Sequence, residues 1–249
     1  MCQLMGNKLV ADKFYACMSF SRFFRNHQLV LGIQPGVVIR NFNQLTTSFG
    51  SQFDSGDGTF NPAYPSHEYL LADKLSYFDC NAGFLWRARI KEYQIAAGVA
   101  VYHLNRPVES FMKNNEEEHL PLRYNVHGSI LIPVTERIDL IPMVLYCETS
   151  GAREFVGGSL LGYSVPSGVK SVKNLYALAF MRINPVRNLD AVMVGGGVRI
   201  LNFDLFISYD VNISTLRKAT NFYGAFEISL IYRNLHTRSK DTTEPCYML

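Results

Sequence analysis

The sequence predicts an all-β fold: an up-and-down antiparallel transmembrane β-barrel of the outer-membrane type. Three observations predict it: long runs of alternating apolar and polar residues, connections that are tight on one side and long on the other, and aromatic residues at the ends of the runs. Phe203–Ile213 and Phe222–Arg233 alternate most clearly. A period of two is typical of a strand with one apolar face, and about 11 residues is the length that a tilted strand needs to cross a bilayer.

About eleven strands follow from the alternation and from the turn residues between the runs. In the third expected strand, apolar side chains such as Phe78 and Trp86 face one way, and polar side chains such as Asp79 and Arg87 face the other. The range 174–183 alternates poorly. The expected strands are 12–24, 27–40, 77–89, 92–104, 122–134, 138–147, 153–164, 174–183, 189–200, 203–214 and 222–233.

The connections between these strands fall into two groups. Outer-membrane barrels have short periplasmic turns, longer extracellular loops and both chain ends inside. Counting back from the last strand places the two longest connections, 41–76 and 105–121, outside. The inner connections are the somewhat longer 165–173 and four tight turns at Arg25–Asn26, Ile90–Lys91, Thr135–Arg137 and Leu201–Asn202.

Aromatic residues gather at the strand ends on the apolar faces, which is what a girdle at the two lipid–water interfaces requires. The alternative is that aromatic residues simply favour strands, but this predicts no preference for strand ends. We predict that the lipid-interface girdle consists of Trp86, Tyr93, Tyr124, Tyr146, Tyr163, Phe203, Phe222 and Tyr232.

Composition excludes several other classes of protein. The chain has 249 residues, and 48% hydrophobic residues with a mean hydropathy of +0.02 exclude a disordered chain. No apolar run is long enough for a transmembrane helix. A formal charge of +3 is too small to predict nucleic-acid binding, and the five cysteines form no C-x-x-C pair.

The N-terminal segment, Met1–Lys13, lacks the charged and apolar regions of a signal peptide. Bacterial single-chain barrels have an even number of strands, and an unclosed sheet would leave unsatisfied backbone groups in lipid. We therefore expect at least one further strand before Met1. On this interpretation, residues 1–249 form a single barrel domain that is incomplete at its N-terminus, and residues 234–249 are a periplasmic tail.

Patterns that carry catalytic or metal chemistry are weak. Gly195–Gly197 is not followed by the Lys-Ser/Thr of a phosphate loop, and such glycines more often mark a bend or close packing in a strand. His103 and His127 have no partner at metal-ligand spacing. His127, Ser129 and Asp139 could form a hydrolytic set, but no nucleophile elbow surrounds Ser129. We expect no enzymatic activity, cofactor, metal or small-molecule substrate.

The polar strand faces would point into the barrel. Charges of both signs there either pair across neighbouring strands as a structural plug or line a water-filled channel of little selectivity. The number and bulk of the side chains favour the plug, with Asp210 and Glu227 sharing cations such as Arg123 or Arg233. The predicted lumen network is Asp79, Arg87, Arg123, Asn125, His127, Asp204, Asp210, Asn212, Glu227 and Arg233.

The two long outer connections are the surfaces on which a partner would bind. Aromatic side chains among Gly, Ser, Asp and Pro are the anchors that dominate interface energetics. The alternative is that the loop folds over its own barrel mouth and buries the rings. The candidate contact residues are Phe49, Phe53, Phe60, Tyr64 and Phe111.

Several segments, in their order and spacing, resemble the PorP/SprF family of outer-membrane components of the type IX secretion and gliding machinery. They are AVYHLNRP (Ala100–Pro107), LPLRYNVH (Leu120–His127), AREF (Ala152–Phe155), ISYDVNIS (Ile207–Ser214), GAFEISLIY (Gly224–Tyr232) and the Pro-Cys ending at Pro245–Cys246.

The resemblance implies a barrel in the outer membrane of a Gram-negative bacterium that acts as a partner or anchor rather than a catalyst. The implied partners are type IX secretion components of the periplasmic ring, the C-terminal domain of a secreted adhesin, and outer-membrane lipid. A general porin or small-solute transporter is the alternative, and a soluble β-domain is a third interpretation.

Overall fold

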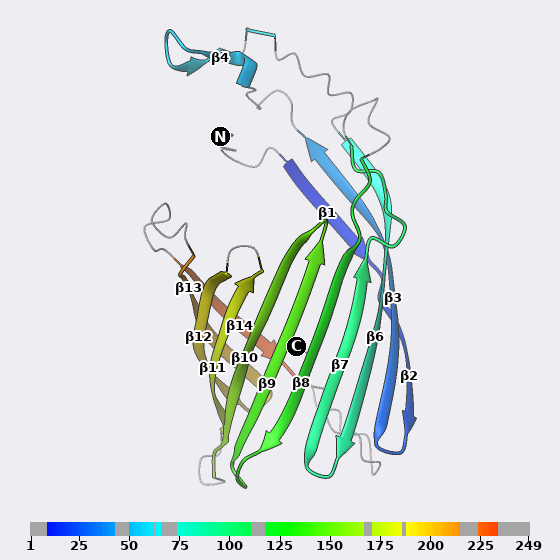
Figure 1. The fold of residues 1–249 in the computed structure, drawn as a ribbon, viewed down its shortest axis with the longest axis vertical. Helices are drawn as coiled ribbons and strands as arrows, with labels where there is room; N and C mark the ends of the chain where they lie inside the picture. The colour runs from blue at the N-terminus through cyan, green and yellow to red at the C-terminus, as the bar shows by residue number, and fades with distance from the viewer. Residues whose placement is uncertain are drawn as a thin grey trace. The chain divides into compact units, whose positions relative to one another are not determined.

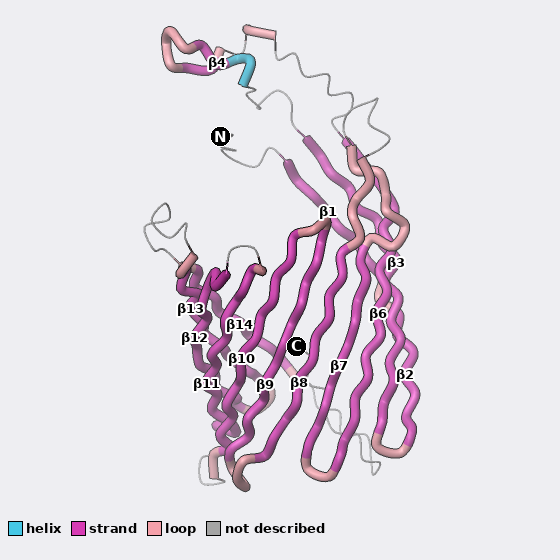
Figure 2. Tube along the Cα trace, in the orientation of Figure 1, coloured by secondary structure: helices cyan, strands magenta, loops and turns pink. Residues whose placement is uncertain are grey.

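The computed structural model describes residues 9–42, 50–61, 63–65, 74–110, 118–166, 171–185, 188–214 and 224–233. Most of these residues are in strands, and the helical part of this portion is the short 3-10 turn η2 (Gly50–Gln52) (Figures 1 and 2). No helix in the described portion has the length and apolarity needed to cross a membrane.

Twelve strands form one antiparallel sheet in the order β1-β3-β6-β7-β8-β9-β10-β11-β12-β13-β14, with β2 pairing with β3 beside this path. Among the described strands, β1 and β14 each have a single neighbour, so the structure shows a sheet rather than a closed barrel. The strands are β1 (Leu9–Tyr15), β2 (Met18–Phe24), β3 (His27–Phe42), β6 (Lys74–Ile90), β7 (Tyr93–Tyr102), β8 (Arg123–Pro133), β9 (Ile138–Thr149), β10 (Ala152–Ser164), β11 (Val172–Asn184), β12 (Asn188–Ile200), β13 (Phe203–Asn212) and β14 (Ala225–Tyr232).

The chain divides into two compact units, and each is described by itself. Unit 1 comprises Met1–Arg22, Val30–Phe84 and Val99–Tyr124. Unit 2 comprises Phe23–Leu29, Leu85–Gly98 and Asn125–Leu249.

The structure confirms the all-β antiparallel sheet, and each expected strand range contains a strand. The first range is divided into β1 and β2 at Ala16–Cys17. Ala16 N donates to Pro35 O over 3.0 Å, but Pro35 has no N–H with which to return a bond, so the ladder is interrupted there. The poorly alternating range 174–183 lies within the 13-residue strand β11. The 41–76 connection also contains an unexpected hairpin, β4 (Phe53–Asp54) and β5 (Thr59–Phe60).

Consecutive strands of unit 2 run up and down, as Figure 1 shows for β8, β9 and β10. Tight turns join several of them, and the backbone dihedral φ is positive at the first turn residue in the hairpins at Arg25, Lys91, Ser150 and Leu201. A positive φ at this position gives a two-residue turn the twist that matches its strands. After β6 the turn is Lys91–Glu92, one residue later than expected, because β6 continues through Ile90.

Burial in this sheet is the reverse of that in a water-soluble domain. Among the described residues, the buried apolar side chains include Val38, Ala88 and Ala191, whereas Asp79, Asn81, Asp204 and Ser214 are buried polar ones. Large apolar side chains such as Ile207 (45% exposed) and Leu230 (67% exposed) lie on the surface. A soluble sandwich, the third interpretation, would hold these side chains in a compact core, since water disfavours exposed apolar area of this extent.

Candidate functional site on the polar face

A buried carboxylate, Asp204 of β13, organises the polar face of unit 2. Its side chain is 1% exposed. Arg199 of β12 donates to it twice, from Nε to Oδ1 over 2.5 Å and from Nη2 to Oδ2 over 3.0 Å. Arg233, just after β14, lies with Nε 2.6 Å from Oδ2. The strand register places Arg199 directly opposite Asp204, so a bidentate pair forms without distortion.

Aromatic rings extend this cluster along the sheet. Tyr176 of β11, Gly197 of β12 and Phe206 of β13 are aligned by the strand register. The rings of Tyr176 and Phe206 meet over the glycine with centroids 5.3 Å apart, and the Arg199 guanidinium lies 5.7 Å from the centre of the Tyr176 ring. A Cβ at Gly197 would clash with Cδ1 of Phe206, so the ring contact depends on glycine at this position.

A second ionic group lies on β11, β12 and β13. Nη2 of Arg182 donates to Oδ2 of Asp210 over 3.1 Å, and its Nε lies 3.4 Å from Oδ2 of Asp190. One cation therefore lies between two carboxylates, and all three side chains are half-buried. Charges at this depth persist when they are paired.

Unit 1 holds a fully buried carboxylate, Asp79 of β6, at 0% exposure. Oη of Tyr15 donates to Oδ2 of Asp79 over 2.7 Å, and Nδ1 of His103 lies 3.0 Å from each carboxylate oxygen. The strand β3 separates β1 from β6, and Tyr15 lies opposite Gly36 of β3. A Cβ at Gly36 would occupy the position of the Tyr15 ring, so glycine lets the tyrosine reach across one strand.

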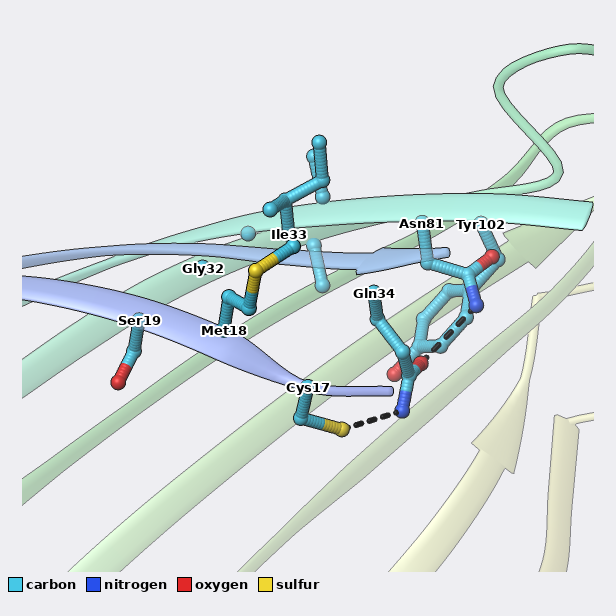
Figure 3. A pocket seen from close by; sticks show the side chains of 11 residues that line it. Cys17, Met18, Ser19, Gly32, Ile33, Gln34, Asn81 and Tyr102 are labelled. Atoms are coloured by element: carbon cyan, nitrogen blue, oxygen red, sulfur yellow. Dashed lines mark hydrogen bonds between the residues drawn. The ribbon is translucent and has the colours of Figure 1, made fainter. Parts of the chain in front are cut away.

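Hydrogen bonds continue from this carboxylate group along unit 1. The backbone N–H of His103 donates to Oδ1 of Asn81 over 3.0 Å, and His103 adopts a φ of 60° there. Nδ2 of Asn81 donates to Oε1 of Gln34, and Nε2 of Gln34 donates to Sγ of Cys17, each over 3.0 Å. Figure 3 shows the side chains of Asn81, Gln34 and Cys17 lining a hollow that Tyr102 also borders. Neutral donors and acceptors on β6, on β3 and at the break between β1 and β2 thus satisfy one another.

A family model described as type IX secretion system membrane protein PorP/SprF matches residues 6–232. The chain belongs to the PorP/SprF family. No curated protein matches it. Membership identifies a membrane component of the type IX secretion system, and the family's description names no enzymatic activity. The resemblance to this family is thereby confirmed, and five of the six segments lie within the matched residues.

The remaining predicted lumen residues of this PorP/SprF chain have smaller contacts. Arg87 donates to Oε1 of Gln28 over 3.4 Å, and the Arg123 guanidinium lies 5.7 Å from the ring centre of Tyr102. Asn212 accepts from Ser214 N, and Glu227 accepts from Ser229 Oγ, each over 3.0 Å. Asn125 and His127 are half-buried on β8.

The prediction of the cation that binds Asp210 was wrong. Arg123 or Arg233 was expected, but Arg182 binds Asp210, and Arg233 binds Asp204 instead. The strand register explains this. Asp210 is paired with Met193 of β12, and the next strand, β11, carries Arg182 close to it. Arg233 instead follows the end of β14, where the register places it near Asp204.

Sequence reasoning left out Arg199, Arg182 and Asp190. Arg199 could have been found, because a two-residue turn at Leu201–Asn202 places it opposite Asp204. The Arg182 contacts could not have been found, because the register between β11 and β12 shifts between Arg182 and Ile183.

The β4–β5 hairpin carries two of the predicted partner-contact rings, Phe53 and Phe60, and a third, Tyr64, follows it. Phe53 and Phe60 meet edge to face with centroids 5.2 Å apart, and Oη of Tyr64 donates to Oδ2 of Asp54 over 3.0 Å. All three rings are exposed. The backbone N–H of Gly56 and the Tyr64 hydroxyl, which both donate to the Asp54 carboxylate, hold its pKa below the ordinary value. Phe49 and Phe111 lie outside the described residues.

The seven described girdle rings lie on the apolar faces, toward the strand ends. Trp86 and Tyr146 are half-buried, and Trp86 stacks on His27 with centroids 6.0 Å apart. Phe203 and Tyr232 pair across β13 and β14 with centroids 5.1 Å apart. Phe222 lies outside the described residues. The exposed members are Tyr93, Tyr124, Tyr163, Phe203 and Tyr232.

Proposed function

We propose that this chain is a non-enzymatic β-barrel in the outer membrane that serves the type IX secretion machinery of a Gram-negative bacterium. It binds periplasmic ring components or anchors a secreted surface protein through the C-terminal domain of that protein. The observation that carries the proposal is the reversed burial: apolar faces are exposed, and the buried side chains include paired carboxylates. An apolar exterior suits lipid, and a paired polar interior suits a plug.

The ionic groups favour an anchor over a porin. Asp204 is closed off by two arginines, and bulky rings of Tyr176 and Phe206 occupy the same polar face. Side chains held this way fill space rather than line a wide aqueous path. Reconstitution in planar bilayers is therefore expected to give no steady ion conductance, and a steady open-channel current would move the porin interpretation to first place.

The partner is identified by affinity purification of the tagged full-length protein from detergent-solubilised outer membrane. We expect either a periplasmic ring component or the C-terminal domain of a secreted protein to be recovered. Phe53→Ala/Phe60→Ala removes both rings of the hairpin, and Ser55→Ala/Thr59→Ala is the matched control in the same hairpin. Loss of the secreted protein with the first variant alone supports surface anchoring through this hairpin. Recovery of the barrel alone from wild type would contradict the proposal.

A further inference from the structure

One end of unit 2 is a continuous row of turns. Backbone hydrogen bonds link four of the five turns to a neighbouring strand end or turn, and in Figure 1 the turns after β2, β6 and β8 lie at the same, lower end. We call this set the turn row: Arg25–Asn26, Lys91–Glu92, residues 134–137, residues 171–173 and Leu201–Asn202. The linking bonds are Arg89 N to Asn26 O (2.8 Å), Ser164 N to Arg137 O (2.8 Å), Leu201 N to Ser171 O (3.0 Å) and Arg233 N to Asn202 O (2.7 Å).

The turn row carries an excess of exposed positive charge. We count the exposed charged residues of the turns together with those of the adjoining strand ends. The acidic ones are Glu92 and Glu136, and the basic ones are Arg25, Arg89, Lys91, Arg137 and Lys173. Within the part of the chain that the structure describes, Arg25, Lys91, Arg137 and Lys173 form no ion pair. Among the described residues at the opposite end of unit 2, the acidic side chains outnumber the basic ones, with Glu148, Glu154, Asp190 and Asp210 against Arg153 and Arg182.

Exposed apolar side chains lie among these cations. Ile90, Val134 and Leu201 are 48%, 57% and 54% exposed, and each is at a turn. The exposed rings of Tyr93 and Tyr163 lie on the strands directly beside the turns. Apolar tips and rings at the same level as cations suit the boundary between acyl chains and phosphate groups, where Lys and Arg reach the headgroups while their stems stay in the apolar layer.

We propose that the turn row binds anionic phospholipid headgroups of the adjacent leaflet, with phosphatidylglycerol as the ligand class. The inference rests on the proposed membrane location. An acidic protein surface would match the charge, but it would leave Ile90, Val134 and Leu201 facing water beside the cations, whereas a phospholipid satisfies both features. A cation near an anionic membrane surface contributes about 1 kcal/mol, so enrichment of the anionic lipid of about fivefold is expected at each occupied position.

Trp86 reports on this end of unit 2, because it is the single tryptophan of the chain and lies on β6 shortly before the Lys91 turn. The full-length protein is reconstituted in vesicles that contain a small fixed fraction of either bromine-labelled phosphatidylglycerol or bromine-labelled phosphatidylcholine. Bromine quenches a nearby indole, so the ratio of the two quenching levels measures the headgroup preference. We expect stronger quenching by phosphatidylglycerol, and a preference that declines at high salt.

Lys91→Gln/Arg137→Gln/Lys173→Gln removes three cations of the turn row. Lys13→Gln/Lys74→Gln/Arg106→Gln is the matched control, since it also removes two lysines and one arginine, all in unit 1. We expect the first variant to lose the preference and the control to keep it. Two results would overturn the proposal: equal quenching by the two labelled lipids in wild type, or an unchanged preference in the first variant. Loss of a protein partner by the first variant would not rescue the proposal in either case.

The test separates this inference from the proposed membrane location. Absence of quenching by either labelled lipid would mean that Trp86 is remote from acyl chains, which contradicts the membrane location itself. Equal quenching by both lipids leaves the membrane location intact and rejects the headgroup site.

Discussion

Arg199→Gln tests whether the ion pairs of the polar face stabilise the fold. The substitution removes both hydrogen bonds to Asp204 and the cation over the Tyr176 ring, and leaves a carboxylate of 1% exposure with Arg233 as its cation. Removing one partner of a buried ion pair costs about 3–5 kcal/mol. Arg233 still neutralises the carboxylate, so the loss should lie at the lower end of this range. We therefore expect the free energy of unfolding to fall by about 3 kcal/mol.

The assay is urea unfolding of the protein refolded in lipid vesicles, with the free energy of unfolding obtained from the transition midpoint and slope. Arg153→Gln is the control, because its exposed pair with Glu148 is expected to contribute little to the free energy of unfolding. Combining Arg199→Gln with Asp204→Asn completes a double-mutant cycle, and we expect coupling of about 2 kcal/mol. A loss for Arg199→Gln no larger than that for Arg153→Gln, or coupling near zero, would refute the reasoning.

Three further predictions follow from the sheet and the hairpin. Gly197→Ala should destabilise by about 1–3 kcal/mol in the same unfolding assay, because its methyl group clashes with Phe206; an unchanged midpoint would show that the rings do not meet there. Ile207→Arg, on the exposed apolar face, should cost about 2–4 kcal/mol, and Ser208→Arg on the polar face should cost less; equal costs would contradict the assignment of the faces. The pKa of Asp54 is lower in the folded hairpin than in the unfolded chain, so this stabilisation is present above its ordinary pKa of 3.8 and is lost as pH falls through the lowered value; NMR of the hairpin amides should show an acid transition that Asp54→Asn abolishes, and persistence of that transition in the variant would assign it to another group.

Alternation of apolar and polar residues predicted most strands of the large sheet, because a sheet with one face in an apolar environment requires that period along its length. It also placed Asp204 and Asp79 on the polar face, where both are buried. It did not predict the β4–β5 hairpin, and it was weak in the range that forms β11. The interruption at Ala16–Cys17 was not predicted, since it depends on the pairing of that segment with Pro35.

Contacts between strands that are distant in sequence were harder to predict from the sequence. The pair of Arg199 and Asp204 follows from one tight turn, but the group around Arg182 depends on a register shift that leaves no local pattern. The contact of Tyr15 with Asp79 crosses an intervening strand. It requires Gly36 on that strand, and the reason for this requirement is seen only once the position of the Tyr15 ring is known.

The pair of Arg199 and Asp204 has a consequence for folding. When the solvent is lipid, a strand that slides by two residues keeps its apolar side chains in an equally favourable medium, so apolar contacts discriminate weakly between alignments. Sliding β13 by two residues along β12 would move Asp204 away from Arg199 and leave a carboxylate without its bidentate donor. The charged residues would thus select the correct alignment of the hairpin during assembly, a task that apolar packing performs in water-soluble proteins.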